Sequence, residues 1–187
     1  MEKCRRRFRP KVCCGEEVFA ELHHSDEKRE CFREIVGKDK DTRGPPPDPF
    51  KCEGRGKFRK NMMCVMNCVA KKKNLIDDDG NIKEDAIKSL FKSKFTDPAW
   101  TTELQDKIIS TCMNEAKNPP PMPKDDANEQ NECNPSLMVF SHCLFKEVQM
   151  QCPNEVITDQ KSCERFRERV KNGDDMMMPP PPPPMDD

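Results

Sequence analysis

The chain has 187 residues, of which 34% are hydrophobic, 36% are charged and 12 are cysteines. Its formal net charge of -1 argues against a nucleic-acid partner, and no apolar run reaches the roughly 18 residues that a membrane span needs. The even, high cysteine count predicts about six disulfide bonds and an oxidising compartment. These bonds would offset the small apolar content, because each one restricts the unfolded chain by roughly 2–4 kcal/mol.

The N-terminal residues 1–15 are basic, carry three cysteines and contain no hydrophobic signal core. Two interpretations remain open, a cytosolic protein or a mature chain whose leader is absent. The number of cysteines favours the second, so we expect a secreted, extracellular protein in which residues 1–15 form an N-terminal extension.

Apolar residues after this extension recur every three or four positions, which is the spacing of one face of an α-helix. No run has the period of two and the β-branched enrichment of a strand. The predicted class is therefore all-α, with six or seven short helices. The expected helices cover about residues 16–24, 25–36, 57–73, 81–95, 97–113, 134–152 and 158–170.

Polar residues in front of several apolar runs predict where helices begin. Ser25 precedes an acidic first turn, and Asn81 with Glu84 resembles a capping box. Asp97 is followed by a proline, a pair typical of an N-cap and the first helical residue. Thr158 is the predicted cap of the last helix.

Proline-rich segments interrupt and follow these helices. Residues 38–58 contain three consecutive prolines, which no helix can pass through, and residues 118–131 are polar and proline-rich. Residues 172–187 are a low-complexity run of methionine and proline that predicts a disordered tail. We therefore expect a single disulfide-linked helical domain at residues 16–171.

Two cysteines share one predicted helix. Cys64 and Cys68 are four positions apart in an apolar run without glycine or proline, so they lie on the same helical face. Their Cβ atoms would be about 5–6 Å apart, which is too far for a disulfide bond between them. Each cysteine should therefore bond to a different segment of the chain.

The acidic residues 77–79, followed by a glycine, invite a calcium-site interpretation. An EF-hand loop with Gly80 in its sixth place needs an acid in the first and a glutamate in the twelfth, but Leu75 and Ala86 stand there. A turn is the better interpretation. No zinc-type cysteine pairs, nucleophile motif or phosphate-binding glycine loop occurs, so we expect no metal, no cofactor and no enzymatic activity.

The order of the later cysteines is distinctive. The motif Cys64-x3-Cys68, with the turn at residues 74–82 after it, looks like the second and third cysteines of insect odorant-binding proteins, and Cys143-x8-Cys152 looks like their last pair. The resemblance extends over about residues 13–167. Further cysteines and one proline make the chain similar to the plus-C subclass: Cys13, Cys14, Cys112, Cys133, Pro153 and Cys163.

This resemblance implies a fold of the PBP/GOBP type, in which the helices surround an apolar cavity. It also implies three bridges, which are Cys31–Cys68, Cys64–Cys143 and Cys112–Cys152. Cys52 is an alternative to Cys31 as a partner of the helix that carries Cys64 and Cys68. The six other cysteines are expected to pair among themselves in an order left open: Cys4, Cys13, Cys14, Cys52, Cys133 and Cys163.

The function that the resemblance implies is that of a secreted carrier of small hydrophobic molecules, such as odorants, pheromones or related semiochemicals. An apolar ligand gains about 25 cal/mol for each Å² that it buries, so a lined cavity suffices without catalysis. The residues expected in or near the cavity are Met66, Val69, Leu90, Phe91, Phe95, Trp100, Ile108, Phe140, Leu144 and Val148.

An alternative is an extracellular interaction protein that uses its disulfide-stabilised surface and its polyproline tail. Under the carrier hypothesis the partner is a small hydrophobic ligand, and a chemosensory receptor or a second copy of the chain is a further partner to test. Deletion of residues 174–187 distinguishes the two, because it should abolish the function only under the interaction hypothesis.

Overall fold

The computed structural model describes residues 13–16, 18, 25–36, 55–118 and 133–172, without the side chains of residues 36 and 55–60. These ranges contain no strand apart from one isolated bridge between Ile76 and Ile82. Their helices are α2 (Asp26–Val36), α3 (Arg55–Lys72), α4 (Glu84–Lys94), α5 (Thr102–Lys117), α6 (Ser136–Met150) and α7 (Gln160–Lys171), with the 3-10 helix η3 (Asn154–Val156) before α7.

The predicted cap of α2 is confirmed. The hydroxyl of Ser25 accepts a hydrogen bond from the backbone N–H of Lys28 at 3.3 Å, as the predicted cap of α2 should. The predicted helix at residues 16–24 lies mostly outside the described residues, although Glu16 and Val18 are helical.

Three of the four predicted caps are wrong: Asp97, Thr158 and Asn81, the last of which is described with its turn below. The carboxylate of Asp97 accepts from Ala99 in a separate turn, whose closing bond runs from the N–H of Trp100 to the carbonyl of Asp97. The helix α5 begins after this turn and is capped by Thr101. The cap of α7 is Asp159, one position after the predicted residue Thr158.

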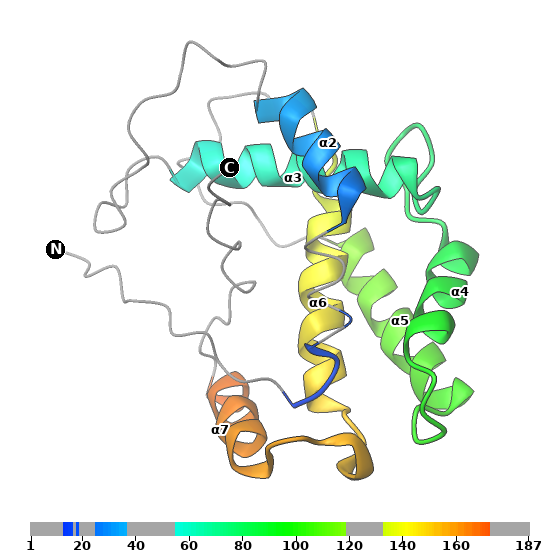
Figure 1. Ribbon diagram of the computed structural model, residues 1–187, viewed down its shortest axis with the longest axis vertical. Coiled ribbons are helices and arrows are strands. Elements are labelled where there is room, and N and C mark those ends of the chain that lie inside the picture. The colour runs from blue at the N-terminus through cyan, green and yellow to red at the C-terminus, as the bar shows by residue number, and fades with distance from the viewer. Residues whose placement is uncertain (1–12, 17, 19–24, 37–54, 119–132, 173–187) are drawn as a thin grey trace, which may run out of the picture.

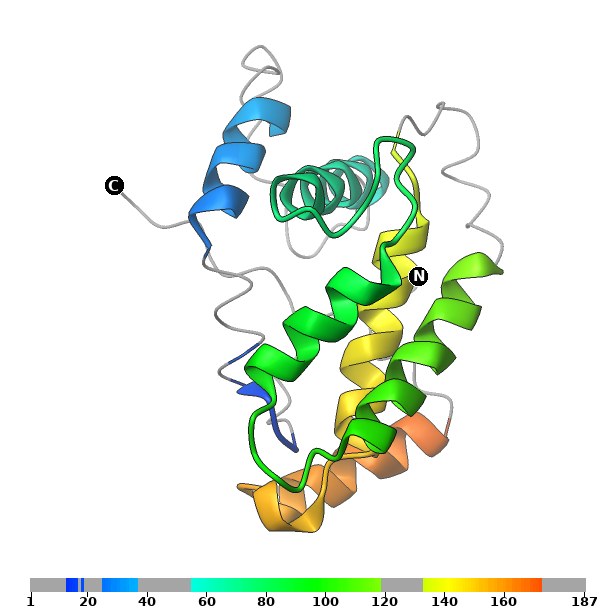
Figure 2. The same ribbon diagram turned by 90° about the vertical axis from the view of Figure 1, so that its right-hand side faces the viewer.

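The main core lies between α4, α5 and α6. Figure 2 shows these helices side by side, with α7 across one end of the group and α2 and α3 at the other end. In Figure 1, α3 crosses α6, and α2 packs on the outside of α3. Cys13 and Cys14 are buried in the main core, although the prediction placed them in the N-terminal extension.

The turn between α3 and α4 is held by hydrogen bonds to one of its own carboxylates. The carboxylate of Asp77 accepts hydrogen bonds from the backbone N–H groups of Asp79 and Asn81, at 3.0 and 2.8 Å, and from the side-chain amide of Asn81. These bonds, above all that of the Asn81 backbone, hold the pKa of Asp77 below its ordinary value. Asn81 therefore belongs to the turn and does not cap α4, whose N-cap Lys83 makes no side-chain capping bond.

Five disulfide bonds join described residues: Cys13–Cys163, Cys14–Cys152, Cys31–Cys68, Cys64–Cys133 and Cys112–Cys143. The predicted Cys31–Cys68 bond is confirmed, which excludes Cys52 as the partner of Cys68. The prediction that Cys64 and Cys68 bond to different segments is also confirmed.

The predicted bonds Cys64–Cys143 and Cys112–Cys152 are wrong. Cys133 lies just before α6 begins and is 5.3 Å from Cys64 between Cα atoms, whereas Cys143 lies further along α6 and faces Cys112. Cys152, beyond the end of α6, is thus left for an N-terminal cysteine, Cys14.

The six remaining cysteines do not pair only among themselves, as was expected. Cys13–Cys163 follows that expectation, but Cys14 and Cys133 bond to cysteines of the predicted central set. The residues Cys4 and Cys52 lie outside the described part of the chain.

No described helix combines the length and the apolar character needed to cross a membrane. Most of the N-terminal extension and nearly all of the predicted tail at residues 172–187 lie outside the described residues. The interaction hypothesis, which depends on that tail, therefore stays a prediction.

Candidate functional site

A cleft of about 360 Å³ opens where three distant parts of the chain meet. The first part consists of residues 14–16 and 18, the second is the end of α4 with the turn after it, and the third runs from the end of η3 towards α7. Figure 2 shows these parts together at the lower end of the view. The lining residues are Cys14, Gly15, Glu16, Val18, Lys94, Phe95, Thr96, Asp97, Trp100, Val156 and Thr158.

The inner surface of the cleft is aromatic. Phe95 and Trp100 are both buried, and their rings meet edge to face with centroids 4.9 Å apart. Phe91, one turn earlier on α4, stacks behind Phe95 at a centroid distance of 4.3 Å. The two phenylalanines share a helix face because they are four positions apart.

Two hydrogen bonds fix the backbone of Trp100. Its N–H donates to the carbonyl of Asp97 at 2.9 Å, and its carbonyl accepts from the side-chain amide of Gln105 at 2.7 Å. These bonds hold the backbone, and edge-to-face contacts with Phe91 and Phe95 hold the indole itself. The aromatic floor is therefore preformed, which lowers the entropic cost of binding a ligand against it.

The outer edge of the cleft is polar. Glu16, Thr96, Asp97 and Thr158 are exposed, and Lys94 is half-buried. An apolar floor with a few polar groups at its edge is the usual composition of a site for a small organic molecule. The described residues contain no group of three or more histidine, cysteine or acidic side chains that could hold a metal ion.

Two of the ten predicted cavity residues, Phe95 and Trp100, line this cleft. The other eight do not. Phe91, Ile108, Phe140 and Val148 are buried in the main core, and Leu144 packs against it. Met66 packs against a second small cluster formed by Ala70, Ile76 and Leu137, whereas Val69 and Leu90 are half-buried.

The walls that come from the two ends of the chain were not predicted from the sequence. Val18 lies in the predicted helix at residues 16–24 and Val156 lies between two predicted helices, so nothing local to either valine indicates that they meet at one cleft. The cysteines were the available signal, because Cys14–Cys152 brings these two walls together. The partner of Cys14 was left open, and Cys152 was expected to bond to Cys112, so this contact was not predicted.

A family comparison bears on the central part of the chain, which contains α3, α4, α5 and both aromatic residues of the cleft. Residues 51–136 match the PBP/GOBP family. This interval ends as α6 begins, so it supplies the aromatic floor of the cleft but neither terminal wall.

The chain is also similar to general odorant-binding protein 68 of Anopheles gambiae. The two are 27% identical over 112 residues, which cover 55% of this chain and 50% of that protein. The chain thus spans about half the length of this curated relative. No solved structure matches the chain. Together with the helices and disulfides described above, the PBP/GOBP match confirms the predicted all-α, disulfide-linked fold class.

Proposed function

We propose that the chain is a secreted, non-enzymatic carrier that binds small hydrophobic molecules in the cleft beside Phe95 and Trp100. The preformed aromatic floor carries this proposal, because it offers apolar surface within a space of ligand size. The PBP/GOBP match and the similarity to a general odorant-binding protein support the same role. Odorants and related semiochemicals are the ligand class that these comparisons favour.

The size of the cleft limits the ligand. Its volume of about 360 Å³ is at the lower end of the range of roughly 300–1,000 Å³ for such sites. A ligand that buries roughly 200 Å² of apolar surface gains about 5 kcal/mol, which alone corresponds to a Kd of roughly 0.2 mM. Apolar burial is therefore not enough for tight binding.

The aromatic residues and the polar edge must supply the remainder. An aromatic contact adds about 0.5–1.5 kcal/mol, and one hydrogen bond at the edge adds about 1 kcal/mol. The total of about 7 kcal/mol corresponds to a Kd of roughly 10 µM. We therefore expect compact ligands that carry one ring and one polar group, in preference to long aliphatic chains.

We further propose that the chain is of the plus-C subclass and is secreted. The bonds Cys13–Cys163 and Cys64–Cys133 support the subclass, since each uses a cysteine that the resemblance assigned to it. Five disulfides among the described residues support an oxidising, extracellular compartment. A chemosensory receptor or a second copy of the chain remains a predicted partner.

The test is a fluorescence titration, because Trp100 is the sole tryptophan of the chain. Ring-containing alcohols, phenols and linear alkanols are added to the protein in turn, and the indole emission is followed. We expect saturable changes with the first two classes and weaker ones with the third. A flat response to all three classes, together with no displacement of a hydrophobic fluorescent probe, would contradict the carrier role.

Two matched variants locate the binding site. Phe95→Leu alters the floor of the cleft and should weaken binding by roughly three- to tenfold, since it removes an aromatic contact. Phe140→Leu makes the same change at a core position outside the cleft, and should lower stability without changing the Kd. Equal losses of affinity in both variants would place the ligand elsewhere.

A further inference from the structure

The side chain of Gln149 is completely buried in α6, with 0% of its surface exposed. Its Oε1 atom accepts hydrogen bonds from the backbone N–H groups of Cys13 and Cys14, at 2.6 and 3.1 Å. Its Nε2 atom donates to the backbone carbonyl of Cys14 at 2.9 Å. One amide therefore pairs three backbone groups of a segment that lies more than 130 positions away in the sequence.

A glutamine in this place costs free energy unless all of its polar atoms are paired, because burying an amide without partners costs roughly 1–3 kcal/mol. No buried side-chain nitrogen or oxygen among the described residues is left without a partner. An amide also fits the task chemically, since it offers an acceptor and a donor in one plane. A hydrocarbon side chain offers neither group, and a carboxylate offers only acceptors.

The segment that Gln149 holds forms one wall of the cleft. Cys14 and Gly15 both line the cleft, and the positive φ of 75° at Gly15 turns the chain directly after the hydrogen-bonded pair. The bonds Cys13–Cys163 and Cys14–Cys152 fix the same segment covalently. In Figure 1 the described residues of this segment, in dark blue, lie beside α6.

The disulfides and the amide act on different degrees of freedom. Each disulfide fixes the position of a sulfur atom but leaves the backbone to rotate about the side-chain bonds. The three hydrogen bonds of Gln149 fix the directions of the backbone N–H and C=O groups. Gln149 itself does not line the cleft, so it can influence a ligand only through this wall.

We propose that Gln149 is a positioning residue for ligand binding, which holds the wall formed by Cys14 and Gly15 against the aromatic floor and so slows release of the ligand. This inference rests on the carrier function proposed above. If the three hydrogen bonds are lost, the two N–H groups and the carbonyl must find water instead. The wall then moves away from the floor, while the residues that touch the ligand stay unchanged.

The test compares two substitutions, with N-phenyl-1-naphthylamine as the fluorescent probe. Gln149→Met keeps the length of the side chain and removes all three hydrogen bonds, and should weaken probe binding by about tenfold or more, mainly through faster dissociation. Gln149→Glu keeps the acceptor for both N–H groups but sets a second oxygen against the carbonyl of Cys14, so the probe should also dissociate faster from this variant than from the wild type. Hydrogen exchange at the amides of Cys13 and Cys14 should increase most in Gln149→Met, which loses their acceptor.

Asn67→Leu is the control. Asn67 is also a buried amide that bonds to backbone carbonyls, those of Met63 and Asn134, but neither it nor its partners line the cleft. This variant should lose stability and keep the dissociation rate of the wild type. If destabilisation in general caused the effect, the probe would dissociate faster from Asn67→Leu as well as from Gln149→Met.

Each outcome decides between the two proposals. If the wild type binds the probe and both Gln149 variants release it at the wild-type rate, the positioning role is wrong and the carrier function stands. If the wild type shows no saturable binding, both proposals fail. Should Gln149→Met not fold, an unchanged dissociation rate in Gln149→Glu overturns the positioning role by itself.

Discussion

Two disulfide bonds in this protein close loops of nearly equal length. Cys31–Cys68 spans 37 positions and Cys112–Cys143 spans 31. In the chain-entropy model, either bond restricts the unfolded chain by about 4 kcal/mol. If loop length alone decided the outcome, replacing either pair by alanine would lower the free energy of unfolding by the same amount.

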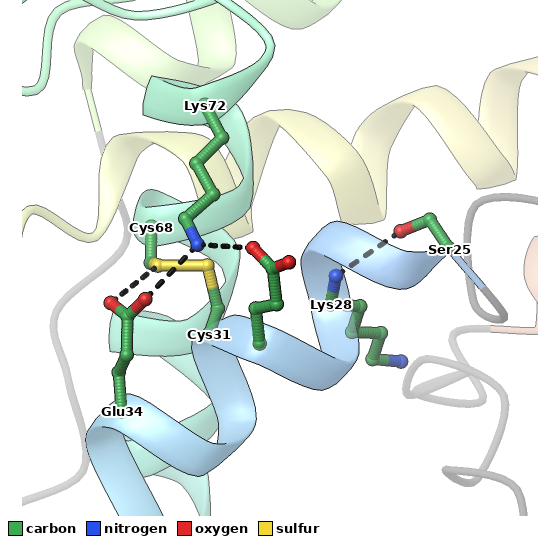
Figure 3. A network of polar contacts seen from close by, with 7 residues as sticks. Ser25, Lys28, Cys31, Glu34, Cys68 and Lys72 are labelled. Carbon is green, nitrogen blue, oxygen red and sulfur yellow. Dashed lines mark hydrogen bonds and ion pairs between the residues drawn. A yellow bond between two sulfur atoms is a disulfide. The ribbon is translucent and has the colours of Figure 1, made fainter.

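The surroundings of the two bonds differ. The helix α2, which carries Cys31, packs mainly on α3, and its Phe32 is 43% exposed. The polar contact between the two helices is made by Lys72 of α3, whose ammonium group lies 2.8 Å from Glu30 and 3.0 Å from Glu34 of α2 (Figure 3). Exposed ion pairs of this kind contribute little, about 0–1 kcal/mol.

Cys112 and Cys143 join α5 to α6 inside the main core, with 0% and 1% of their surfaces exposed. We expect the double variant Cys112→Ala, Cys143→Ala to lose at least about 4 kcal/mol, because a cavity adds to the loop entropy. In the double variant Cys31→Ala, Cys68→Ala, α2 can leave α3 while the rest stays folded. Its loss should therefore be smaller, about 1–3 kcal/mol, because the native state also gains freedom.

Urea unfolding followed by circular dichroism gives both free energies, and hydrogen exchange with mass spectrometry reports on α2 separately. We expect fast exchange in α2 and unchanged exchange in α5 and α6 when Cys31 and Cys68 are replaced. Equal losses of free energy in the two variants, with α2 still protected, would refute the argument that the docking of α2 depends on its disulfide.

The remaining predictions concern the turn before α4 and the ion pairs of α2. Gly80→Ala should lower the free energy of unfolding by roughly 1–2 kcal/mol in urea, since φ is +84° there and the new Cβ would stand 2.9 Å from a side-chain carbon. The pKa of Asp77 is lowered chiefly by the N–H of Asn81, so its stabilisation is present above its unfolded pKa and is lost as the pH falls through the folded value. The stability difference between wild type and Asp77→Asn should shrink as urea midpoints are measured from about pH 5 to pH 2, and a constant difference would contradict this. The hydrogen bond to Glu30 raises the pKa of Lys72 and lowers that of Glu30, so stabilisation is lost in strong base as Lys72 deprotonates and in acid as Glu30 protonates. Lys72→Met should therefore speed hydrogen exchange in α2 at pH 7 and have no such effect at about pH 2.

Much of the helical architecture could be predicted, because apolar spacing is a local signal. The apolar runs of α3 and α6 have no competing pattern, and Ser25 caps α2 as its position suggested. The start of α5 was misplaced because Asp97 has two uses that look alike in sequence. It can cap a helix or close a turn, and the backbone bond from Trp100 decides for the turn.

The cleft could be predicted only in part. Phe95 and Trp100 were among ten apolar residues chosen for their helical spacing, and they line the cleft. Val148 and Ile108 have equally good spacing, but packing places them in the core, and spacing alone cannot tell a core residue from a residue beside a cleft. The walls depend on pairings between cysteines more than 130 positions apart, which local patterns do not encode.

Only part of the cleft lies within the family match. Its aromatic side falls within the residues that match the PBP/GOBP family, and its two remaining sides fall outside them. A relative that shared residues 51–136 but had shorter ends would present its indole to solvent. Under the carrier function proposed above, exchange of the terminal segments between such relatives should change which ligands are retained, while the core packing of α4 and α5 is kept.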